Sequence, residues 1–282
     1  MSESGDSRAA ADPVTAASRP TEDSLLFVGT ATTLIRYAGF TVLTDPNFLH
    51  RGQRAYLGRG LWSKRRTEPA LSVDQLPALD LVVLSHLHGD HFDRVARRGL
   101  DRAVPVATTP HAARRLSRWG FAADGLSTWR STELTDGDRR LRVTALPGRH
   151  AFGPAARLLP PVMGSLLEFS APDRPDLTLY LSGDTLYHDG LRAIRDRYGA
   201  ADLGVLHLGG TRILGMTVTM DGRAGVDLLH LLRPAAAVGI HHDDYGVFRS
   251  PLSDFLAEAG RRPPGTRVLE VARGGELPLP PR

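Results

Sequence analysis

The sequence of 282 residues contains no cysteine. This absence excludes disulfides, thiolate nucleophiles, iron–sulfur clusters and cysteine-ligated zinc, so any metal must be held by nitrogen and oxygen ligands. Long apolar runs are also lacking. Nowhere do about 18 apolar residues follow one another, which is the length that a membrane-spanning helix requires. Residues 1–24 hold no apolar stretch of the kind that signal peptides carry. We therefore expect a cytoplasmic protein without a transmembrane segment.

Lysine is almost absent, since Lys64 is the only lysine among 35 cationic residues. The net charge of +4 and the isoelectric point of about 9.8 would by themselves suggest a nucleic-acid partner. The arginines are spread along most of the chain, however, and two clusters have helical spacing. These clusters are Arg94/Arg97/Arg98/Arg102 and Arg114/Arg115/Arg118. Such spacing is typical of solvated helix faces, so no nucleic-acid partner is expected.

The composition predicts one folded domain with a tail at each end. Apolar residues make up 41 % and charged residues 23 %, which are ordinary values for a globular protein. Residues 1–24 are rich in Ser, Ala, Pro and Asp and are expected to be a disordered tail. Residues 25–275 contain no linker, repeat or change of composition, so they predict a single domain. Residues 276–282 are expected to form a C-terminal tail.

The hydrophobic pattern predicts an α/β protein. Strands are expected over residues 25–28, 32–37, 40–44, 81–84, 104–108, 141–146, 165–170, 177–182, 203–208 and 235–240. Helices are expected over residues 92–98, 110–119, 191–198, 222–232 and 253–259. Strands dominate the first part of the chain and alternate with helices later, which indicates the α/β class. The Arg- and Gly-rich stretch 47–69 has weak periodicity and is expected to be an irregular loop.

Histidine and aspartate residues gather where the predicted strands end. The ends of four strands carry His86/His88/Asp90/His91, His150, Asp184 and His241. Because strand ends and the loops after them carry the chemistry of α/β proteins, these groups can converge on one cleft. In an extended segment residues two apart share a face, so His86, His88 and Asp90 can point the same way. Burying this cluster without a ligand would be costly, so it predicts a metal site.

The cluster His86-Leu-His88-Gly-Asp90-His91 resembles the signature of the metallo-β-lactamase superfamily. Further motifs of that family occur in the same order along the chain. They are Thr30-Ala-Thr-Thr-Leu-Ile35, Thr44-Asp45-Pro46, Pro147-Gly-Arg-His150, Ser182-Gly-Asp184-Thr and Ile240-His241. The resemblance implies a four-layer αβ/βα sandwich with a dinuclear metal centre between its two sheets.

The same resemblance implies a role for each ligand. It places His86, His88 and His150 on the first metal ion, Asp90, His91 and His241 on the second, and Asp184 between the two. Imidazole and carboxylate ligands suit zinc, and they also accept manganese or iron. Two divalent ions can share a hydroxide and so provide a nucleophile at neutral pH. Asp90 is the expected catalytic residue, which orients this hydroxide or accepts its proton.

Within the superfamily the sequence is similar to a branch that includes the N-acyl-phosphatidylethanolamine-hydrolysing phospholipase D and the ascorbate-6-phosphate lactonase. The segments that carry this similarity are Gln75-Leu-Pro-Ala-Leu-Asp80, Leu208-Gly-Gly210 and Thr219-Met-Asp221. The resemblance implies a metal-dependent hydrolase of phosphodiesters or small phosphorylated lactones, with a small-molecule or lipid-like substrate.

Two histidines depart from the pattern of that branch, and both are expected to face the substrate. His207 stands where the branch often has proline, and His242 begins a polar run with Asp243 and Asp244. Alternation along a strand sends the neighbours His241 and His242 to opposite faces, so only one of them can reach a metal ion. His241 directly follows the apolar strand and is the expected ligand.

Three other functions remain open on the residues alone. An iron-dependent redox enzyme, such as a persulfide dioxygenase or a diiron oxygen reductase, uses the same fold, although diiron relatives usually carry a flavin domain for which this chain has no room. A ribonuclease is suggested by His88-Gly-Asp90-His91 and the high isoelectric point, but the long exosite arm of such an enzyme is missing. The third possibility is a catalytically inactive binding module, but such a module would not need every metal-ligand position to be filled.

Overall fold

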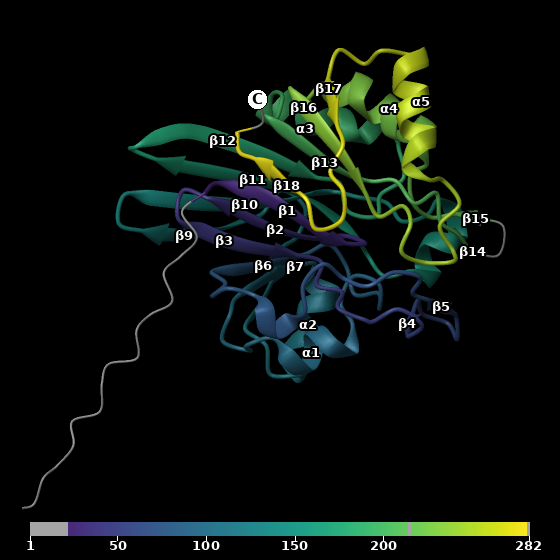
Figure 1. Ribbon diagram of the computed structural model, residues 1–282, viewed down its shortest axis with the longest axis horizontal. Coiled ribbons are helices and arrows are strands. Elements are labelled where there is room, and N and C mark those ends of the chain that lie inside the picture. The colour runs from purple at the N-terminus through teal and green to yellow at the C-terminus, as the bar shows by residue number, and fades with distance from the viewer. Residues whose placement is uncertain (1–21, 214–215, 281–282) are drawn as a thin grey trace, which may run out of the picture.

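Two seven-stranded sheets lie face to face at the centre of the protein (Figure 1). The computed structural model describes residues 22–213 and 216–280, so the tail expected over residues 1–24 lies almost entirely outside the described residues. In the first sheet the strand order is β18-β1-β2-β3-β6-β7-β8, and in the second it is β17-β16-β13-β12-β11-β10-β9. Both sheets are mixed, with parallel pairing at one end and antiparallel pairing at the other.

The strands of the first sheet are β1 (Ser24–Gly29), β2 (Thr32–Tyr37), β3 (Phe40–Thr44), β6 (Leu81–Leu84), β7 (Val106–Thr108), β8 (Ala123–Gly125) and β18 (Glu276–Pro278). Those of the second are β9 (Ser131–Asp136), β10 (Arg139–Pro147), β11 (Met163–Ala171), β12 (Arg174–Leu181), β13 (Leu203–His207), β16 (Ala236–Ile240) and β17 (Arg267–Leu269). Two small ribbons are formed by β4 (Arg54–Tyr56) with β5 (Trp62–Lys64), and by β14 (Arg212–Ile213) with β15 (Met216–Thr217).

Helices cover the outer face of each sheet. The helices are α1 (Arg94–Gly99), α2 (Pro110–Arg118), α3 (Arg192–Tyr198), α4 (Gly222–Leu232) and α5 (Leu252–Arg261), with short 3-10 turns at η1 (Val73–Gln75), η2 (Gly153–Leu158) and η3 (Asp189–Leu191). Side chains of α1 and α2 pack on the first sheet, and those of α3, α4 and α5 pack on the second. Among the described residues, no helix has both the length and the apolar character that a membrane crossing needs.

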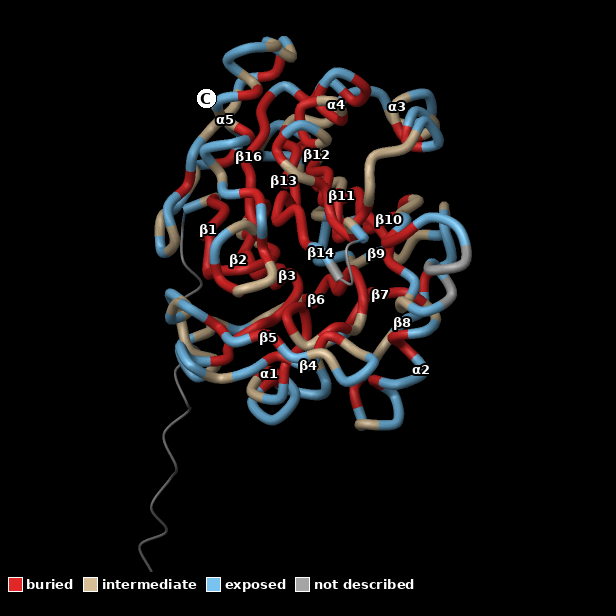
Figure 2. The backbone as a smooth tube through the Cα atoms, turned by 90° about the vertical axis from the view of Figure 1, so that its right-hand side faces the viewer, coloured by how far each residue is buried: buried red, intermediate tan, exposed pale blue. Residues whose placement is uncertain are grey.

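Continuous apolar runs explain why the strands are buried on both faces. In β6, Leu81 and Val83 pack between the two sheets, while Val82 and Leu84 pack against the helices. A run of this kind is typical of a strand covered on both sides. Figure 2 shows the result, with buried strands in the middle of the molecule and exposed segments mainly on the helices and outer loops. The predicted four-layer αβ/βα sandwich is therefore confirmed.

Strand direction brings the chemically active segments to one edge. Strands β12, β13 and β16 are parallel to one another, and β10 runs in the same direction because two antiparallel pairings separate it from β12. In the first sheet β3 and β6 are also parallel. The carboxyl ends of parallel strands meet at the same edge of a sheet, which is where open α/β sheets bind their ligands.

Two predictions about the ends and loops of the chain were wrong. Residues 276–282 are not simply a tail, because Glu276–Pro278 forms β18, which pairs antiparallel with β1, and Leu279 is buried in the core. The stretch 47–69 is not wholly irregular, because it contains the β4–β5 hairpin. Both elements are only three residues long, and their pairing partners or packing surfaces rather than their local periodicity define them.

Candidate metal centre

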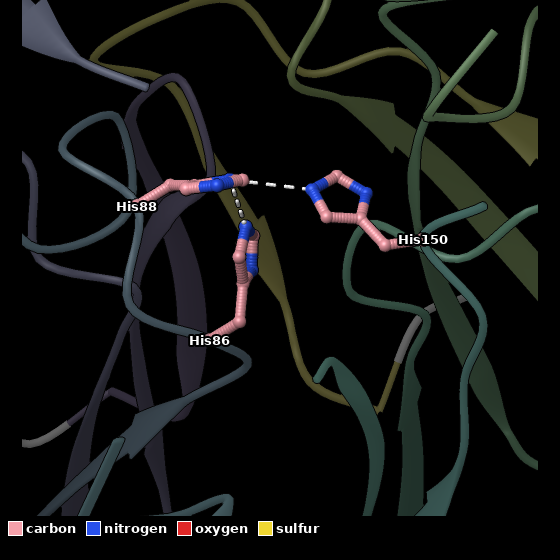
Figure 3. A group of neighbouring side chains, drawn as sticks. All are labelled: His86, His88 and His150. Atoms are coloured by element: carbon pink, nitrogen blue, oxygen red, sulfur yellow. Dashed lines mark hydrogen bonds between the residues drawn. The ribbon is translucent and has the colours of Figure 1, made fainter. Parts of the chain in front are cut away.

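Three histidine rings point toward one another between the two sheets. His86 and His88 lie in the loop after β6, and His150 follows β10 on the opposite side (Figure 3). The Nε2 atom of His86 is 2.9 Å from the Nδ1 atom of His88, and that Nδ1 is 3.2 Å from the Nε2 atom of His150. The other ring nitrogen of His150 lies 2.7 Å from the carbonyl oxygen of Val218, which fixes the orientation of this ring. The structure thus brings this predicted trio together.

The three rings are held in their neutral form. Burial, together with the neighbouring imidazole of His150, lowers the pKa of His88 to about 3. Burial and the nearby rings of His91 and His88 place the pKa of His86 well below its usual value, and burial also lowers the pKa of His150. A neutral imidazole keeps a lone pair free, which is the form that binds a metal ion. The trio is therefore prepared to act as a set of three nitrogen ligands.

A second group of buried residues lies beside the trio. The Nε2 atom of His91 is 3.2 Å from an oxygen of Asp184, and the Nε2 atom of His241 is 3.5 Å from an oxygen of Asp90. The Nδ1 atom of His241 is 3.6 Å from the other oxygen of Asp184. Each of these distances is short enough for the two atoms to bind one ion, and His86, His91 and Asp184 form an overlapping group of the same kind.

Several atoms of the second group are buried without a hydrogen bond. They are Oδ1 of Asp90, Nε2 of His91, Oδ1 of Asp184 and both ring nitrogens of His241. A buried polar atom without a partner costs about 1–3 kcal/mol, so a cluster of them demands an explanation. Divalent metal ions accept this combination of imidazole nitrogen and carboxylate oxygen. The donor set therefore fits a metal centre.

Charge complementarity holds the carboxylates of this group in the ionised form. Burial alone would raise the pKa of Asp184, but the rings of His241 and His91 lower it well below its usual value. Burial would likewise lower the pKa of His91, yet the carboxylates of Asp184, Asp45 and Asp90 raise it well above the usual value. The carboxylates of the second group thus carry negative charge, and a metal ion that binds there would displace the proton from His91.

The adjacent histidines His241 and His242 point to different surroundings. His241 has a φ of 61°, in the left-handed region that few non-glycine residues adopt, and its backbone N–H donates to the carbonyl of Thr30 at 2.7 Å. The turn at His241 ends the strand alternation and directs this ring into the second group. The ring of His242 instead lies 6.3 Å from the ring of Phe27 and near Asp243, outside each of the metal-competent groups among the described residues.

Asp45 and His207 form a further pair next to His91. The Oδ1 atom of Asp45 accepts hydrogen bonds from the backbone and hydroxyl of Ser85, at 2.8 and 2.9 Å. Its Oδ2 atom lies 3.3 Å from Nδ1 of His91 and 3.4 Å from Nε2 of His207. Burial alone would raise the pKa of Asp45, but the rings of His91 and His207 hold it at about 2. Asp45 is thus an anion that can fix the ring of His91.

The position of His207 differs from the prediction that it faces the substrate. Its side chain is only 3 % exposed, its ring stacks on that of His91 at 5.8 Å, and its Nδ1 lies 3.2 Å from the hydroxyl of Ser182. His207 is the last residue of β13, and its ring lies behind that of His91. Sequence reasoning placed Asp45 only within a family motif and did not select it for the site. The position of Asp45 directly after β3 is the sequence signal that could have assigned it to the site.

A buried network braces the loops that carry the two groups. Arg65 is fully buried and donates to the carbonyl and side-chain oxygens of Asn47, at 2.9 and 2.6 Å, and it lies 3.3 Å from Asp244. Asn47 in turn donates to the carbonyl of Gly89, and Asp244 accepts from the backbone of Thr30. The network therefore ties the loop after β6 to the segment that holds His241.

Comparison with known proteins gives the family. The family described as a beta-lactamase superfamily domain matches residues 41–242, which is well over half of the chain. The chain belongs to the metallo-β-lactamase superfamily. The resemblance predicted from the six motifs is confirmed.

Three curated relatives are 24–31 % identical to the chain over their aligned residues. An uncharacterized protein of Mycobacterium tuberculosis is 31 % identical over 191 residues, which are 64 % of this chain but 47 % of that protein. The N-acyl-phosphatidylethanolamine-hydrolyzing phospholipase D 1 of Caenorhabditis elegans is 26 % identical over 233 residues, covering 78 % of this chain and 63 % of the relative. A UPF0173 metal-dependent hydrolase of Thermofilum pendens is 24 % identical over 222 residues, covering 78 % and 87 %. The chain thus spans about half of the first relative's length.

Solved structures of the superfamily share the fold. An isothiocyanate hydrolase from Delia radicum gut bacteria aligns with a TM-score of 0.74 at 20 % identity, over 90 % of this chain and 98 % of that one. The metallo hydrolase Igni18 of Ignicoccus hospitalis aligns with a TM-score of 0.66 at 21 % identity, over 91 % of this chain and 98 % of that one. CmlA, a diiron β-hydroxylase of Streptomyces venezuelae, aligns at 0.65 and 17 % identity, over 93 % and 55 %.

Truncating the two adjacent histidines separates their roles. We expect His241→Ala to lower metal affinity by about 10-fold or more, because losing a ligand should exceed the loss of a residue that only orients one. His242→Ala should leave the metal stoichiometry intact, since its ring lies beside Phe27 and Asp243. Elemental analysis after dialysis against a chelator checks both. Loss of an ion from the His242 variant, with a fully loaded His241 variant, would contradict this assignment.

Substitution of His207 tests whether its contact with Asp45 helps to hold the ring of His91 in place. We expect His207→Leu to weaken binding of one metal ion by about 10- to 100-fold, the usual effect of removing a group that orients a ligand. His207→Gln, which keeps an N–H donor for Asp45, should restore part of that affinity, and the exposed His230→Gln on α4 serves as the control. Competition with a chromophoric chelator measures the affinities. Unchanged affinity in His207→Leu would show that Asp45 holds His91 without help.

Proposed function

We propose that the protein is a metal-dependent hydrolase that holds two divalent metal ions and acts on phosphodiesters or small phosphorylated lactones. The observation that carries the proposal is the convergence of buried, unpartnered nitrogen and oxygen atoms at one edge of the sandwich. The names of two relatives support it, since one is a metal-dependent hydrolase and the other a phospholipase D.

The proposed ligands divide between the two ions according to their chemistry. The neutral trio His86, His88 and His150 would hold the first ion. Asp90, His91 and His241 would hold the second, with Asp184 between the two because it forms one metal-competent group with His86 of the trio and His91 of the second group. This mixture of imidazole and carboxylate ligands favours zinc, and it also accepts manganese or iron.

Two divalent ions bound there would supply a bridging hydroxide as nucleophile and polarise the bond that it attacks. The chain itself contributes a proton acceptor. The Oδ1 atom of Asp90 is buried and accepts no hydrogen bond, while His91 and His241 keep the pKa of this carboxyl below its usual value against the opposing effect of burial. Asp90 is therefore ionised at neutral pH and can receive a proton from the attacking water at Oδ1. Asp45 and His207 would hold the ring of His91 in place during this proton transfer.

Substitution of Asp184 tests the proposal most simply. We expect the wild-type protein to contain about two metal ions per chain and to hydrolyse bis(4-nitrophenyl) phosphate or a phosphorylated lactone. Asp184→Ala should lower metal content and abolish turnover together, because one carboxylate serves both ions. Asp196→Ala, an exposed aspartate on α3, is the matched control and should change neither quantity.

Other results would contradict the proposal. One tightly bound ion that survives Asp184→Ala, with turnover intact, would rule out two ions sharing this carboxylate. A coloured, iron-loaded protein that consumes oxygen and hydrolyses none of these substrates would favour the redox alternative, since the diiron β-hydroxylase CmlA has the same fold. Cleavage of RNA that falls steeply with salt would favour the ribonuclease.

A further inference from the structure

A cavity adjoins the metal-competent trio on the side of the first sheet. It has a volume of about 320 Å³ and lies between the β4–β5 hairpin, the loop after β6, and helices α1 and α2. This size is at the lower end of the range of roughly 300–1,000 Å³ for small-molecule sites. His88 and Gly89 form part of its wall. The cavity thus reaches a proposed metal ligand directly.

Aromatic side chains form the apolar part of this cavity. Tyr56 and Trp62 face each other across the β4–β5 hairpin with ring centroids 4.9 Å apart, yet they remain 45 % and 58 % exposed. Trp119 lines the cavity from the end of α2 and stacks on Phe92 at 6.3 Å. Large aromatic side chains exposed together at the mouth of a cavity are typical of a surface that binds a ligand.

The charge of the cavity is positive. Arg54, Arg94 and Arg115 line it, and none of them has a carboxylate within ion-pair distance among the residues that the structure describes. The guanidinium of Arg115 lies 5.5 Å from the ring of Trp119, which places cation and aromatic ring side by side. Arg94 and Arg115 lie on exposed faces of α1 and α2, as their helical spacing predicted, and both faces also line this cavity.

The one acidic residue in the wall does not neutralise these arginines. Asp93 is buried, and its Oδ1 atom accepts from the backbone N–H groups of Val95 and Ala96 at the start of α1. Its Oδ2 atom accepts from the N–H groups of Phe48 and Leu49. All of its hydrogen-bonding capacity is therefore directed at the backbone, and the arginines are left for an anion from outside the chain.

The hairpin also links this cavity to both sides of the metal centre. Gly58 at its turn packs against the ring of His88, and Nε of Arg59 donates to the carbonyl of Leu158 at 3.3 Å. Leu158 belongs to η2, which follows His150 along the chain. The hairpin is thus positioned to contact a substrate whose reacting group lies between His88 and His150.

We propose that this cavity binds the non-reacting part of the substrate, and that this part is a flat apolar group bearing a carboxylate or a phosphate. The proposal rests on the proposed hydrolase function. The rings of Tyr56 and Trp62 would stack on the apolar group, and Arg94 and Arg115 would bind its anion. The reacting phosphoryl or acyl group then extends past His88 to the metal centre. Substrate selection is therefore separate from the groups that perform the reaction.

Two phosphodiesters with the same leaving group test this proposal. They are 4-nitrophenyl phenyl phosphate and 4-nitrophenyl 4-carboxyphenyl phosphate, which differ only in the carboxylate. We expect the wild-type protein to have a KM about 10-fold lower for the carboxylated substrate, the effect of one charge-assisted hydrogen-bonded pair. In the double variant Arg94→Gln/Arg115→Gln this preference should disappear, because the KM of the carboxylated substrate rises to that of the uncharged one. Arg267→Gln, an exposed arginine on β17, is the control and should keep the preference.

Binding of a dye examines the same cavity without any reaction. We expect the metal-loaded protein to bind the anionic dye 8-anilinonaphthalene-1-sulfonate more tightly than the uncharged N-phenyl-1-naphthylamine, as measured by fluorescence titration. Arg94→Gln/Arg115→Gln should weaken the anionic dye about 10-fold and leave the uncharged dye unchanged, whereas Trp62→Ala should weaken both. Trp62 is largely exposed, so its removal leaves the core intact.

The two experiments distinguish the failure of each proposal. If neither phosphodiester is hydrolysed but the dyes respond to the variants as described, the proposed function is wrong and the anion site stands. If the wild-type protein hydrolyses both substrates and the double variant keeps the wild-type ratio of KM values, the cavity does not select substrates. Dye affinities that no cavity variant changes would likewise overturn the anion site.

Discussion

The arrangement of the candidate metal centre depends on the unfavourable burial of polar side chains at one edge of the two sheets. Histidine and aspartate side chains from six strand ends are buried there, and many of their polar atoms lack a hydrogen bond. Burial without partners is unfavourable for each of them, so cations that bind these atoms together would offset the cost. The network of Arg65, Asn47 and Asp244 keeps the loops from relaxing away from one another. The contacts of the chain itself thus hold these loops together.

The loops around this centre have distinct tasks because of where their strands end. The loop after β6 supplies ligands to both groups, whereas β13 and β3 end in His207 and Asp45, which contact His91 from behind. The β4–β5 hairpin lies outside this arrangement, on the exposed side of His88, and carries aromatic side chains instead of ligands. In the proposed function, the reaction would take place at the sheet edges and the surface hairpin would contact the substrate, a common division in α/β proteins.

Sequence alone sufficed for features that local patterns encode. The apolar run of β6 predicted a strand, and the cluster after it predicted side chains that converge on one place. Helix α4 was predicted with its observed bounds. Features that depend on distant partners were missed. Strand β18 exists only through its pairing with β1, and the burial of Arg65 follows from Asp244 about 180 positions away. The position of His207 depends on its contacts with Asp45 and His91, which come from other strands.

The central claim is that this edge of the sandwich holds two metal ions, and calorimetric titration of the metal-free protein with zinc tests it most directly. Two equivalents should bind, and each should raise the free energy of unfolding by about 4 kcal/mol when free zinc exceeds its Kd by about 1,000-fold. The melting temperature should therefore rise in step with the second equivalent as well as the first. Binding of one equivalent or none, with an unchanged melting temperature beyond it, would contradict the claim.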